Sequence, residues 1–430
     1  MPTFFLETYG CTANHSASEI MSYLLRECGF QRVQEIKKAA IVIINTCIVK
    51  APTEDKIKNL LKKLHKNHLL IVAGCLPQVM DEWCQEFIPK ASLIGVDHFK
   101  DICQVANEHL KGKKVILLSR KQSFQEIIHK SRQNPLTGII EISKGCTGNC
   151  AYCIVKFAKG PLISKPPEMI MKETHQALAD GCKQLWLTAQ DTASYGKDIG
   201  TNLPELLTQI IQIPRDFIIR IGMMTVDHAL TIEKELIEIL AHPKVYAFAH
   251  LPVQSASNRI LKKMNRQYSI EEFLHLISTL RERIPNITLS TDVIVGFPTE
   301  TQKDHNKTIT LLTEKNFDIV NISKYGDRPG TEASFSKQKI PSQIIKKRSK
   351  EITKVVHKKT LERNRNWIDW EGAALALKED PFQDGYLLRN RFYKIVGTKS
   401  RNIKLGNWYS VKITGATKTR LHGQILNKLK

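Results

Sequence analysis

Apolar runs alternate with amphipathic stretches along the first hundred residues of the chain. Short runs rich in apolar residues cover three segments, 4–8, 41–46 and 69–73. The stretches between them, 16–29 and 54–67, repeat apolar residues at helical spacing. Strands and helices that alternate in this order build a parallel sheet covered by helices. We therefore predict an α/β fold that begins with an open parallel sheet domain at residues 1–112.

The alternation resumes beyond a polar stretch at 130–135, which predicts a domain boundary. Helical patterns such as 167–180 and 269–284 separate six further apolar runs. These six predicted strands cover residues 138–143, 184–189, 217–223, 245–252, 287–295 and 318–325. Six strand–helix units predict a partial (β/α)6 barrel of the TIM type over residues 132–340, with its active site at the carboxyl ends of the strands.

The pattern changes again in the last fifth of the chain. Residues 344–366 read as one long basic helix within a helical connector at 341–366. After it come short apolar runs at close spacing, for example 385–388, 393–396 and 408–417. Short strands separated by turns are typical of a small β-barrel. We therefore predict a third, all-β domain at residues 367–430.

The charge of the chain favours a polyanionic partner. Of its 430 residues, 42% are hydrophobic and 25% are charged, which is ordinary for a globular protein of several domains. The formal net charge is +22, and residues 341–430 hold 21 Lys and Arg against 7 Asp and Glu. Such a surface attracts nucleic acid by releasing counterions, although a solvated basic surface is the alternative.

No segment of the sequence predicts targeting or membrane insertion. The first residues lack a basic region followed by a long apolar run, and no later apolar run is long enough to span a bilayer. We therefore expect a soluble, cytoplasmic protein with no membrane partner.

Three of the ten cysteines follow predicted strands of the first domain. In a cytoplasmic chain, this number of cysteines favours reduced, metal-binding thiols over disulfides. Cys11, Cys47 and Cys75 each lie just past the end of an apolar run. Because ligand sites of open parallel sheets form at the carboxyl ends of strands, the three thiols are expected to converge there. A single cysteine in such a place is usually a small buried apolar residue, but three at equivalent positions favour a metal site.

A second group of cysteines lies directly after the first strand predicted for the barrel. Cys146, Cys150 and Cys153 form a C-x3-C-x2-C motif. One loop with this spacing can deliver three thiolates to a 4Fe–4S cluster and leave the fourth iron open to a substrate, with a zinc-knuckle fragment as the alternative. The remaining cysteines fall in or beside helical patterns and are expected to be structural residues: Cys28, Cys84, Cys103 and Cys182.

The C-x3-C-x2-C motif, with the aromatic Tyr152 before its last cysteine, resembles the signature of the radical S-adenosylmethionine superfamily. The resemblance implies that the open iron binds the amino and carboxylate groups of S-adenosylmethionine. It also implies that one-electron reduction releases a 5′-deoxyadenosyl radical, with the chemistry supplied by the cofactors and the positioning by the protein.

The segments around the first three cysteines resemble the amino-terminal domain of the methylthiotransferases, a narrower family in which these cysteines hold an auxiliary 4Fe–4S cluster. Those segments are 7–11, 45–47 and 73–75. The resemblance continues through motifs at 187–192, 250–255, 264–266, 291–298 and 328–331. The terminal β module resembles the TRAM domain, a small RNA-binding barrel. Residues 11–16 and 411–417 look most like the archaeal and eukaryotic branch that acts on threonylcarbamoyladenosine in tRNA.

The resemblance implies a transferase that uses two 4Fe–4S clusters and S-adenosylmethionine. One S-adenosylmethionine methylates sulfur on the auxiliary cluster, and a second yields the radical that removes the C2 hydrogen of an N6-threonylcarbamoylated adenosine next to the anticodon. The implied partners are the anticodon loop of tRNA and unidentified electron and sulfur donors. Alternative substrates are isopentenyladenosine in tRNA and an aspartate of a ribosomal protein. A non-catalytic, RNA-binding iron–sulfur protein is the alternative of another class.

Polar residues at predicted strand ends are, with Tyr152, candidate contacts to S-adenosylmethionine. They are Gln190, Asp191, Arg220, Gln254 and Asp292. For each one alone, a structural hydrogen bond or ion pair is an equally good interpretation. Aromatic residues near the basic helix are candidates for stacking on RNA bases or for the barrel core: Trp367, Trp370, Tyr386, Phe392, Tyr393 and Trp408.

Four positions depart from the pattern of the family. Ala256 and Thr299 stand where glycine is common, and alanine tolerates a positive φ poorly. Lys159 and Lys165 stand where arginine is frequent, and lysine cannot form the two-pronged contact that arginine makes with a carboxylate or phosphate. We expect altered local shape and altered substrate contacts at these positions, with no cluster ligand lost.

Overall fold

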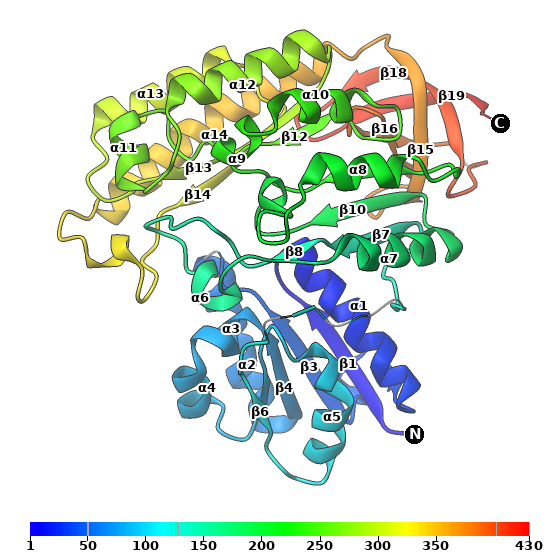
Figure 1. The fold of residues 1–430 in the computed structure, drawn as a ribbon, viewed down its shortest axis with the longest axis vertical. Coiled ribbons are helices and arrows are strands. Elements are labelled where there is room, and N and C mark those ends of the chain that lie inside the picture. Colours follow the sequence, from blue (N-terminus) through cyan, green and yellow to red (C-terminus); the bar gives the residue numbers. More distant parts are fainter. Residues whose placement is uncertain (50, 122, 125, 127–128, 401, 430) are drawn as a thin grey trace.

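The protein consists of three structural units, each built around its own sheet or barrel (Figure 1). The computed structural model describes residues 1–49, 51–121, 123–124, 126, 129–400 and 402–429. The amino-terminal sheet, blue to cyan, lies below the central open barrel, green to yellow. The small closed barrel at the C-terminal end, orange to red, lies beside the central unit. The predicted α/β class with a terminal all-β barrel is confirmed.

The amino-terminal unit is a sheet of six parallel strands in the order β2-β1-β3-β4-β5-β6. Its strands are β1 (Thr3–Thr8), β2 (Gln31–Arg32), β3 (Ile41–Thr46), β4 (Leu69–Gly74), β5 (Ser92–Ile94) and β6 (Ile116–Leu117). Its helices are α1 (Thr12–Glu27), α2 (Ala51–Asn67), α3 (Cys75–Val79), α4 (Asp81–Phe87) and α5 (Ile102–Leu110). Ile41 and Ile43 pack with α1 and α5, whereas Val42 and Ile44 pack with the other three helices. Residues 41–44 of β3 are all apolar because helices cover both faces of the sheet.

The central unit is an open barrel of six parallel strands. They are β7 (Thr137–Glu141), β10 (Gln184–Thr188), β11 (Ile218–Ile221), β12 (Phe248–His250), β13 (Thr288–Val295) and β14 (Ile319–Lys324). The strands form two three-stranded sheets, β11-β10-β7 and β12-β13-β14. Two isolated β-bridges, Ile219–Val245 and Met223–His250, connect the sheets into one continuous series of strands. The six strands coincide, within a few residues at their ends, with the six predicted runs, so the predicted partial barrel is confirmed.

Helices follow the strands of the central barrel. They are α6 (Val155–Lys159), α7 (Pro167–Ala179), α8 (Leu203–Ile211), α9 (Val226–Leu230), α10 (Glu233–Ala241), α11 (Asn258–Lys263), α12 (Ile270–Arg283) and α13 (Gln302–Glu314). Ser269 and Thr301 start α12 and α13 with capping boxes, and α12 matches the predicted helical pattern at 269–284. A short antiparallel pair, β8 (Ser143–Lys144) and β9 (Ile163–Ser164), flanks the loop with the C-x3-C-x2-C motif.

One long helix, α14 (Ser342–Arg365), connects the central unit to the closed barrel. Its buried residues are Arg348, Ile352, Val356, Thr360 and Asn364, which recur every four positions and therefore lie along one face. The barrel strands are β15 (Glu371–Glu379), β16 (Tyr386–Asn390), β17 (Ile395–Thr398), β18 (Trp408–Ala416) and β19 (Leu421–Lys428), closed in the order β15-β16-β17-β19-β18. No helix in the described part of the chain is long and apolar enough to cross a membrane.

The aromatic residues proposed for RNA stacking belong to packed interiors. Trp367, Trp370, Tyr386 and Phe392 pack in the core of the closed barrel. Tyr393 and Trp408 pack instead against Tyr246 and Phe248 of the central unit. The structure therefore supports the barrel-core interpretation for the first four residues and an interface with the central unit for the other two.

Two cysteines expected to be structural thiols form a disulfide instead. Cys28, at the end of α1, and Cys103, in α5, are bonded, with a Cα–Cα distance of 6.3 Å. The pairing arises because the two helices lie on the same face of the sheet. The expectation of reduced thiols is wrong for this pair, whereas Cys84 and Cys182 are free cysteines as predicted, and both are buried.

Buried ion pairs join the amino-terminal sheet to the central barrel. Lys130 lies 2.5 Å from Glu173 of α7 and donates a hydrogen bond of 2.8 Å to Ser16 of α1. A second buried pair joins Arg328, which follows β14, to Glu54 of α2. Removing one partner of a buried pair leaves an uncompensated charge, so these contacts favour one relative orientation of the two units.

A single buried carboxylate joins the central unit, α14 and the closed barrel. Asp318, whose side chain is fully buried, lies 2.7 Å from the ammonium of Lys394 in the barrel and 3.1 Å from Arg363 of α14. Arg281 of α12 approaches it at 3.5 Å, and the backbone N–H of Leu289 donates to it at 3.0 Å. Cations from three elements thus converge on one anion.

Replacing this carboxylate should destabilise the protein strongly. Asp318→Ala leaves three cations without their counter-ion, and we expect the free energy of unfolding to fall by about 3–5 kcal/mol in urea denaturation. The control is Glu35→Ala, which removes an exposed pair with Lys38 and should cost at most about 1 kcal/mol. Equal effects of the two substitutions would contradict a central role for Asp318.

Candidate active site between two cysteine trios

A cavity of about 610 Å³ lies between the edge of the amino-terminal sheet and the central barrel. Cys11 and Val49 line it from the amino-terminal unit, and Cys153 lines it from the loop after β8. Barrel strands and the segment that follows β12 contribute further lining residues: His250, Gln254, Asp292, Ile294 and Asn321. The cavity therefore touches one cysteine from each predicted group, and it lies at the carboxyl ends of strands, where the sequence predicts the site.

Cys11, Cys47 and Cys75, called the amino-terminal trio below, follow three neighbouring strands. These strands, β1, β3 and β4, pair in parallel, with Asn45 opposite Thr8 and Thr46 opposite Gly74. Each cysteine comes within three residues of its strand, so all three lie at the same edge of the sheet, as predicted.

The helix α1 begins directly after Cys11, four residues earlier than the apolar pattern predicts. Its first turn contains buried polar residues such as Asn14, which apolar periodicity does not detect. Gly10 precedes it with φ of +122°, and a Cβ there would stand 2.6 Å from the Cβ of Cys47. Glycine is therefore required for Cys11 and Cys47 to lie in adjacent loops.

Two buried asparagines, Asn14 and Asn45, hold the loops of the amino-terminal trio. Asn14 donates to the carbonyl oxygens of Tyr9 and Thr46 at 2.9 and 2.8 Å. Asn45 donates to the carbonyl oxygen of Asn14 at 2.8 Å and to the hydroxyl of Ser18 at 2.9 Å. Both asparagines stand in the sequence motifs around the cysteines, but no local pattern marks their structural role.

Burial raises the pKa of two thiols of the amino-terminal trio. Burial raises the pKa of Cys75 to about 12 and also raises the pKa of Cys47. The charge of Cys11 raises both pKa values further, which shows that the three sulfur atoms interact. Thiolate is the metal-binding form, so cluster binding must release protons.

A buried lysine accompanies this trio. Lys159 in α6 is 7% exposed, and its ammonium lies 3.8 Å from Glu141. Burial alone would lower the pKa of Lys159, but the charges of Glu141, Cys75 and Cys11 raise it. Lys159 therefore remains a cation beside the amino-terminal trio, and it retains a positive charge at a position where arginine is frequent.

Cys146, Cys150 and Cys153, called the loop trio below, lie on one loop between β8 and α6. Gly145 has φ of +76°, and a Cβ there would stand 1.7 Å from the carbonyl oxygen of Pro161, so this turn requires glycine. The backbone N–H of Gly148 donates to the sulfur of Cys146 at 3.2 Å. Burial raises the pKa of Cys146 to about 11, and the charge of Asp191 contributes.

The loop trio is held against the end of α11. The backbone N–H of Ala151 donates to the carbonyl oxygen of Met264 at 3.0 Å. The side chain of Asn265 donates to the carbonyl oxygen of Asn149 at 2.7 Å. The guanidinium of Arg266 donates to the sulfur of Cys150 at 3.1 Å. The motif at 264–266 thus supports the cysteine loop, a role that the sequence did not reveal.

Both trios fit iron–sulfur clusters by the chemistry of their donors. Each offers three thiols on rigid loop positions, and hydrogen bonds from N–H groups to two sulfurs of the loop trio are of the kind that stabilise thiolates. The described residues include no group of three His, Cys, Asp or Glu side chains arranged around a single metal ion. Thiolates of a 4Fe–4S cluster bind different irons, so they need not surround one point.

The candidate contacts to S-adenosylmethionine occupy different surroundings. Tyr152 and Gln254 line the cavity, and Gln254 has φ of +61°, a strained conformation that often marks a binding site. Gln190 keeps a buried side-chain oxygen without a hydrogen-bond partner. Arg220 lies 5.5 Å from the ring centre of Phe248, inside the barrel. Tyr152 and Gln254 therefore lie at the cavity, whereas the side-chain oxygen of Gln190 is buried and accepts no hydrogen bond from the described residues.

The carboxylate of Asp191 contacts His228, a residue that no sequence motif singled out. Its buried carboxylate accepts hydrogen bonds from the backbone and hydroxyl of Thr225 at 3.0 and 2.6 Å. It also lies 2.6 Å from Nδ1 of His228, whose Nε2 lies 3.4 Å from the hydroxyl of Thr147 in the cysteine loop. Asp191 therefore orients His228 toward the loop trio.

The departures from the family pattern have unequal consequences. Thr299 has φ of +70°, which is costly for a β-branched residue, so local strain is present there. Ala256 has no positive φ, and the expected strain is absent. Lys165 pairs with buried Glu173 at 2.6 Å and is part of the junction between units.

Comparisons with known proteins agree with these features. A family model of the radical SAM superfamily matches residues 140–312, and one described as uncharacterized protein family UPF0004 matches residues 3–95. A Drosophila melanogaster protein named threonylcarbamoyladenosine tRNA methylthiotransferase is 36% identical over 98% of this chain and 77% of its own length. The human protein of that name is 34% identical over 99% and 74%. A Pyrococcus horikoshii protein, with "probable" before the same name, is 34% identical over 99% and 100%.

Solved structures share the fold at low sequence identity. The radical S-adenosylmethionine methyltransferase TsrM from Kitasatospora setae superposes with a TM-score of 0.57. It is 14% identical, and the match covers 78% of this chain and 77% of TsrM. This likeness supports the fold alone.

The raised thiol pKa values predict unequal alkylation of the metal-free protein. Cys11 is exposed and should react readily with iodoacetamide at pH 8, whereas Cys75 should react far more slowly because it is buried and protonated. Below its pKa, the thiolate fraction of Cys75 rises about tenfold per pH unit, and its labelling rate should rise with it. Peptide mass spectrometry measures both rates. Equal, pH-independent rates would contradict the assigned environments.

Proposed function

Because the chain belongs to the radical S-adenosylmethionine family of threonylcarbamoyladenosine tRNA methylthiotransferases, we propose that it attaches a methylthio group to C2 of N6-threonylcarbamoyladenosine in tRNA. The observation that carries this proposal is the cavity that both Cys11 and Cys153 line. A reaction that joins sulfur from one site to a carbon activated at another needs both sites on one substrate pocket. The proposed place of action is the cytoplasm.

The loop trio would hold the cluster that binds S-adenosylmethionine, and the amino-terminal trio would hold a second 4Fe–4S cluster. When bound, these cofactors supply a radical that can break an unactivated C–H bond, and a sulfur that can be methylated. The protein positions the cofactors and the substrate relative to each other. Tyr152 and Gln254 lie where they can contact S-adenosylmethionine, and Gln190 offers a buried oxygen that lacks a donor.

Polar side chains on the barrel side of the cavity can orient the substrate base. His250 lies 3.1 Å from Asp292, and Asn321 donates to the other oxygen of Asp292 at 2.7 Å. These groups offer donors and acceptors next to the apolar wall made by Ile294 and Ile322. A pocket of this mixed character suits a purine that carries a polar threonylcarbamoyl group.

Arg328 closes the amino-terminal side of the cavity. It pairs with Glu54 and donates to the carbonyl oxygen of Val49 at 2.9 Å. Its charge also lowers the pKa of Cys47, against the dominant effect of burial. Arg328 thus holds the loop after β3 against the barrel and favours the thiolate form of a neighbouring cysteine.

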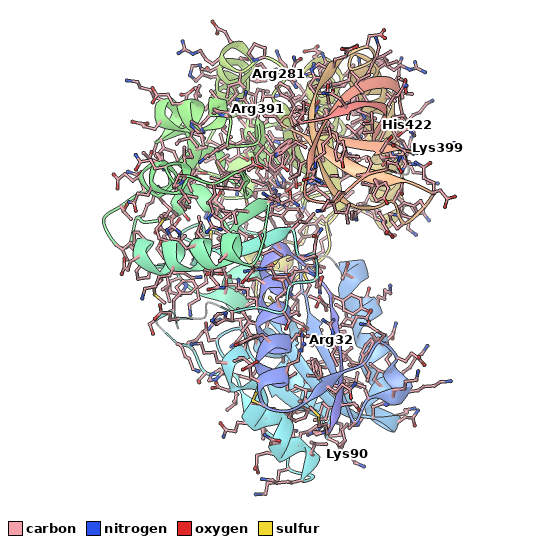
Figure 2. All side chains as sticks on the ribbon, turned by 90° about the vertical axis from the view of Figure 1, so that its right-hand side faces the viewer. Arg32, Lys90, Arg281, Arg391, Lys399 and His422 are labelled. Carbon is pink, nitrogen blue, oxygen red and sulfur yellow. A yellow bond between two sulfur atoms is a disulfide. The ribbon has the colours of Figure 1, made fainter. Side chains whose placement is uncertain are left out.

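The closed barrel and α14 are the proposed tRNA surface, with the barrel in the role of a TRAM domain. One face of α14 is buried, and most of its Lys side chains lie on the other face, where they are exposed to solvent. Lys399 and His422 lie on the outer side of the barrel (Figure 2). Cations spread over this surface can follow the phosphates of an anticodon stem. The same surface supports tRNA over a protein aspartate as substrate.

Two measurements separate the remaining alternatives. Isopentenyladenosine and threonylcarbamoyladenosine occur in different tRNA nucleoside fractions, so mass analysis after the reaction identifies which one gains a methylthio group. A non-catalytic iron–sulfur protein would release no 5′-deoxyadenosine when dithionite and S-adenosylmethionine are added. Besides tRNA and S-adenosylmethionine, the proposed reaction requires an electron donor and a sulfur donor as partners.

Changing the amino-terminal trio to alanine should separate radical formation from sulfur transfer. After anaerobic reconstitution, iron should fall from about eight to about four per chain in Cys11→Ala/Cys47→Ala/Cys75→Ala. This variant should still release 5′-deoxyadenosine but form no 2-methylthio nucleoside, because the second cluster is lost. Cys84→Ala, which changes a buried cysteine outside both trios, is the control and should keep about eight irons. About four irons in the parent and the triple variant alike would refute the second cluster.

An exposed aromatic residue on the barrel should contribute to tRNA binding. Phe382, between β15 and β16, is 87% exposed, and its backbone N–H is held by Asp380 at 3.0 Å. If a base stacks on it, Phe382→Ala should weaken tRNA affinity about tenfold. The salt dependence should stay unchanged because no charge is lost.

Fluorescence anisotropy with labelled tRNA measures this effect. Phe87→Ala, which removes a 38% exposed phenylalanine from α4, is the matched control and should leave affinity unchanged. Equal affinity of the parent and Phe382→Ala proteins would exclude stacking on Phe382.

A further inference from the structure

A charged side chain from outside the cysteine loop contacts the loop trio. Arg266 follows α11, and its Nη1 donates to the sulfur of Cys150 at 3.1 Å. Among the described residues, it makes no ion pair with a carboxylate. The sulfur of Cys146, by contrast, accepts a hydrogen bond from the backbone of Gly148, which is neutral. Cys150 therefore receives a hydrogen bond from an uncompensated cation.

The position of Arg266 is fixed by a buried tyrosine. The guanidinium carbon lies 4.9 Å from the ring centre of Tyr268, and Nε lies 3.3 Å from its hydroxyl. That hydroxyl lies 2.8 and 3.0 Å from the carbonyl oxygens of Pro252 and Val253, at the end of a barrel strand. Tyr268 is 6% exposed. The barrel, rather than solvent, thus determines where the charge of Arg266 lies.

Arg266 also has an unused donor. Its Nη2 is buried and lacks a hydrogen-bond acceptor in the described part of the chain. A buried donor without a partner costs free energy unless something else accepts its hydrogen bond. Bridging sulfides of a cluster held by the loop trio, or a ligand bound to it, would be acceptors of the right charge.

We propose that Arg266, held by Tyr268, is a positioning residue that raises the reduction potential of the cluster on the loop trio. The inference rests on the proposed function, because it takes the loop trio as cluster ligands. Adding one electron makes the cluster and its thiolates more negative. A cation that donates to a ligand sulfur stabilises this reduced form more than the oxidised form. Arg266 thereby makes the electron transfer that precedes cleavage of S-adenosylmethionine easier.

The test is a reductive titration of the reconstituted, full-length protein, followed by electron paramagnetic resonance. The amino-terminal trio is replaced by alanine in every sample, so that the signal comes from one cluster. Arg266→Met removes the charge and the hydrogen bond. At a fixed applied potential, the ratio of reduced to oxidised cluster should fall about tenfold, which is about 59 mV for one electron.

Graded variants distinguish a charge effect from general damage. Arg266→Lys keeps the charge and should give a smaller shift than Arg266→Met. Tyr268→Phe removes the hydroxyl beside Nε and should shift the potential in the same direction, by less. Lys263→Met removes an exposed charge from the last residue of α11, and the potential should equal that of the parent because solvent screens the charge.

Iron and sulfide analysis of the same samples separates the two proposals. If the samples with an intact loop trio hold no cluster, the ligand assignment in the proposed function is wrong. If they hold about four irons and the parent, Arg266→Met and Arg266→Lys proteins share one potential, the role of Arg266 is wrong. If Arg266→Met alone loses its cluster, Arg266→Lys and Tyr268→Phe decide the question, and unchanged potentials in both overturn the inference.

Discussion

The docking of the amino-terminal sheet onto the central barrel is the constraint on which the candidate site depends. Neither unit contains the cavity alone, because Cys11 comes from one and Cys153 from the other. Buried pairs such as Lys130–Glu173 and Arg328–Glu54 cross the junction. Ion pairs of this kind add little net stability, since desolvation offsets their attraction, but a displaced arrangement would leave charges buried and unpaired. They therefore favour one geometry, and that geometry places one cysteine of each trio on the same pocket.

Charge is also arranged around each set of thiols. Lys159 stands beside the amino-terminal trio, and Arg266 donates to the loop trio. Burial disfavours thiolate at both sites, as the raised pKa values of Cys75 and Cys146 show. The cations work in the opposite direction and favour the charged forms that bind iron. If the two trios hold the proposed clusters, cluster binding would release protons and would depend on these nearby charges.

The C-terminal third combines a rigid connection with a basic surface. Asp318 ties α12, α14 and the barrel together through three cations, while exposed lysines of α14 such as Lys347, Lys354 and Lys358 face solvent. The aromatic residues near α14 are used to pack the barrel and to attach it to the central strands. The proposed RNA surface therefore consists mainly of Lys and Arg side chains, and Phe382 is an exposed aromatic residue beside them.

The sequence by itself determined the six strands of the central barrel, the strands β1, β3 and β4 of the amino-terminal sheet, the two cysteine groups and the basic C-terminal region, but not β2, β5 and β6. Apolar periodicity and cysteine spacing are local properties, so they survive without knowledge of the fold. The pairing of Cys28 with Cys103, the hydrogen bond from Arg266 to Cys150 and the shared cavity of Cys11 and Cys153 join residues far apart in the chain. Only the tertiary structure decided these contacts, because long-range proximity is set by how the helices and strands pack and leaves no periodic signal in the sequence.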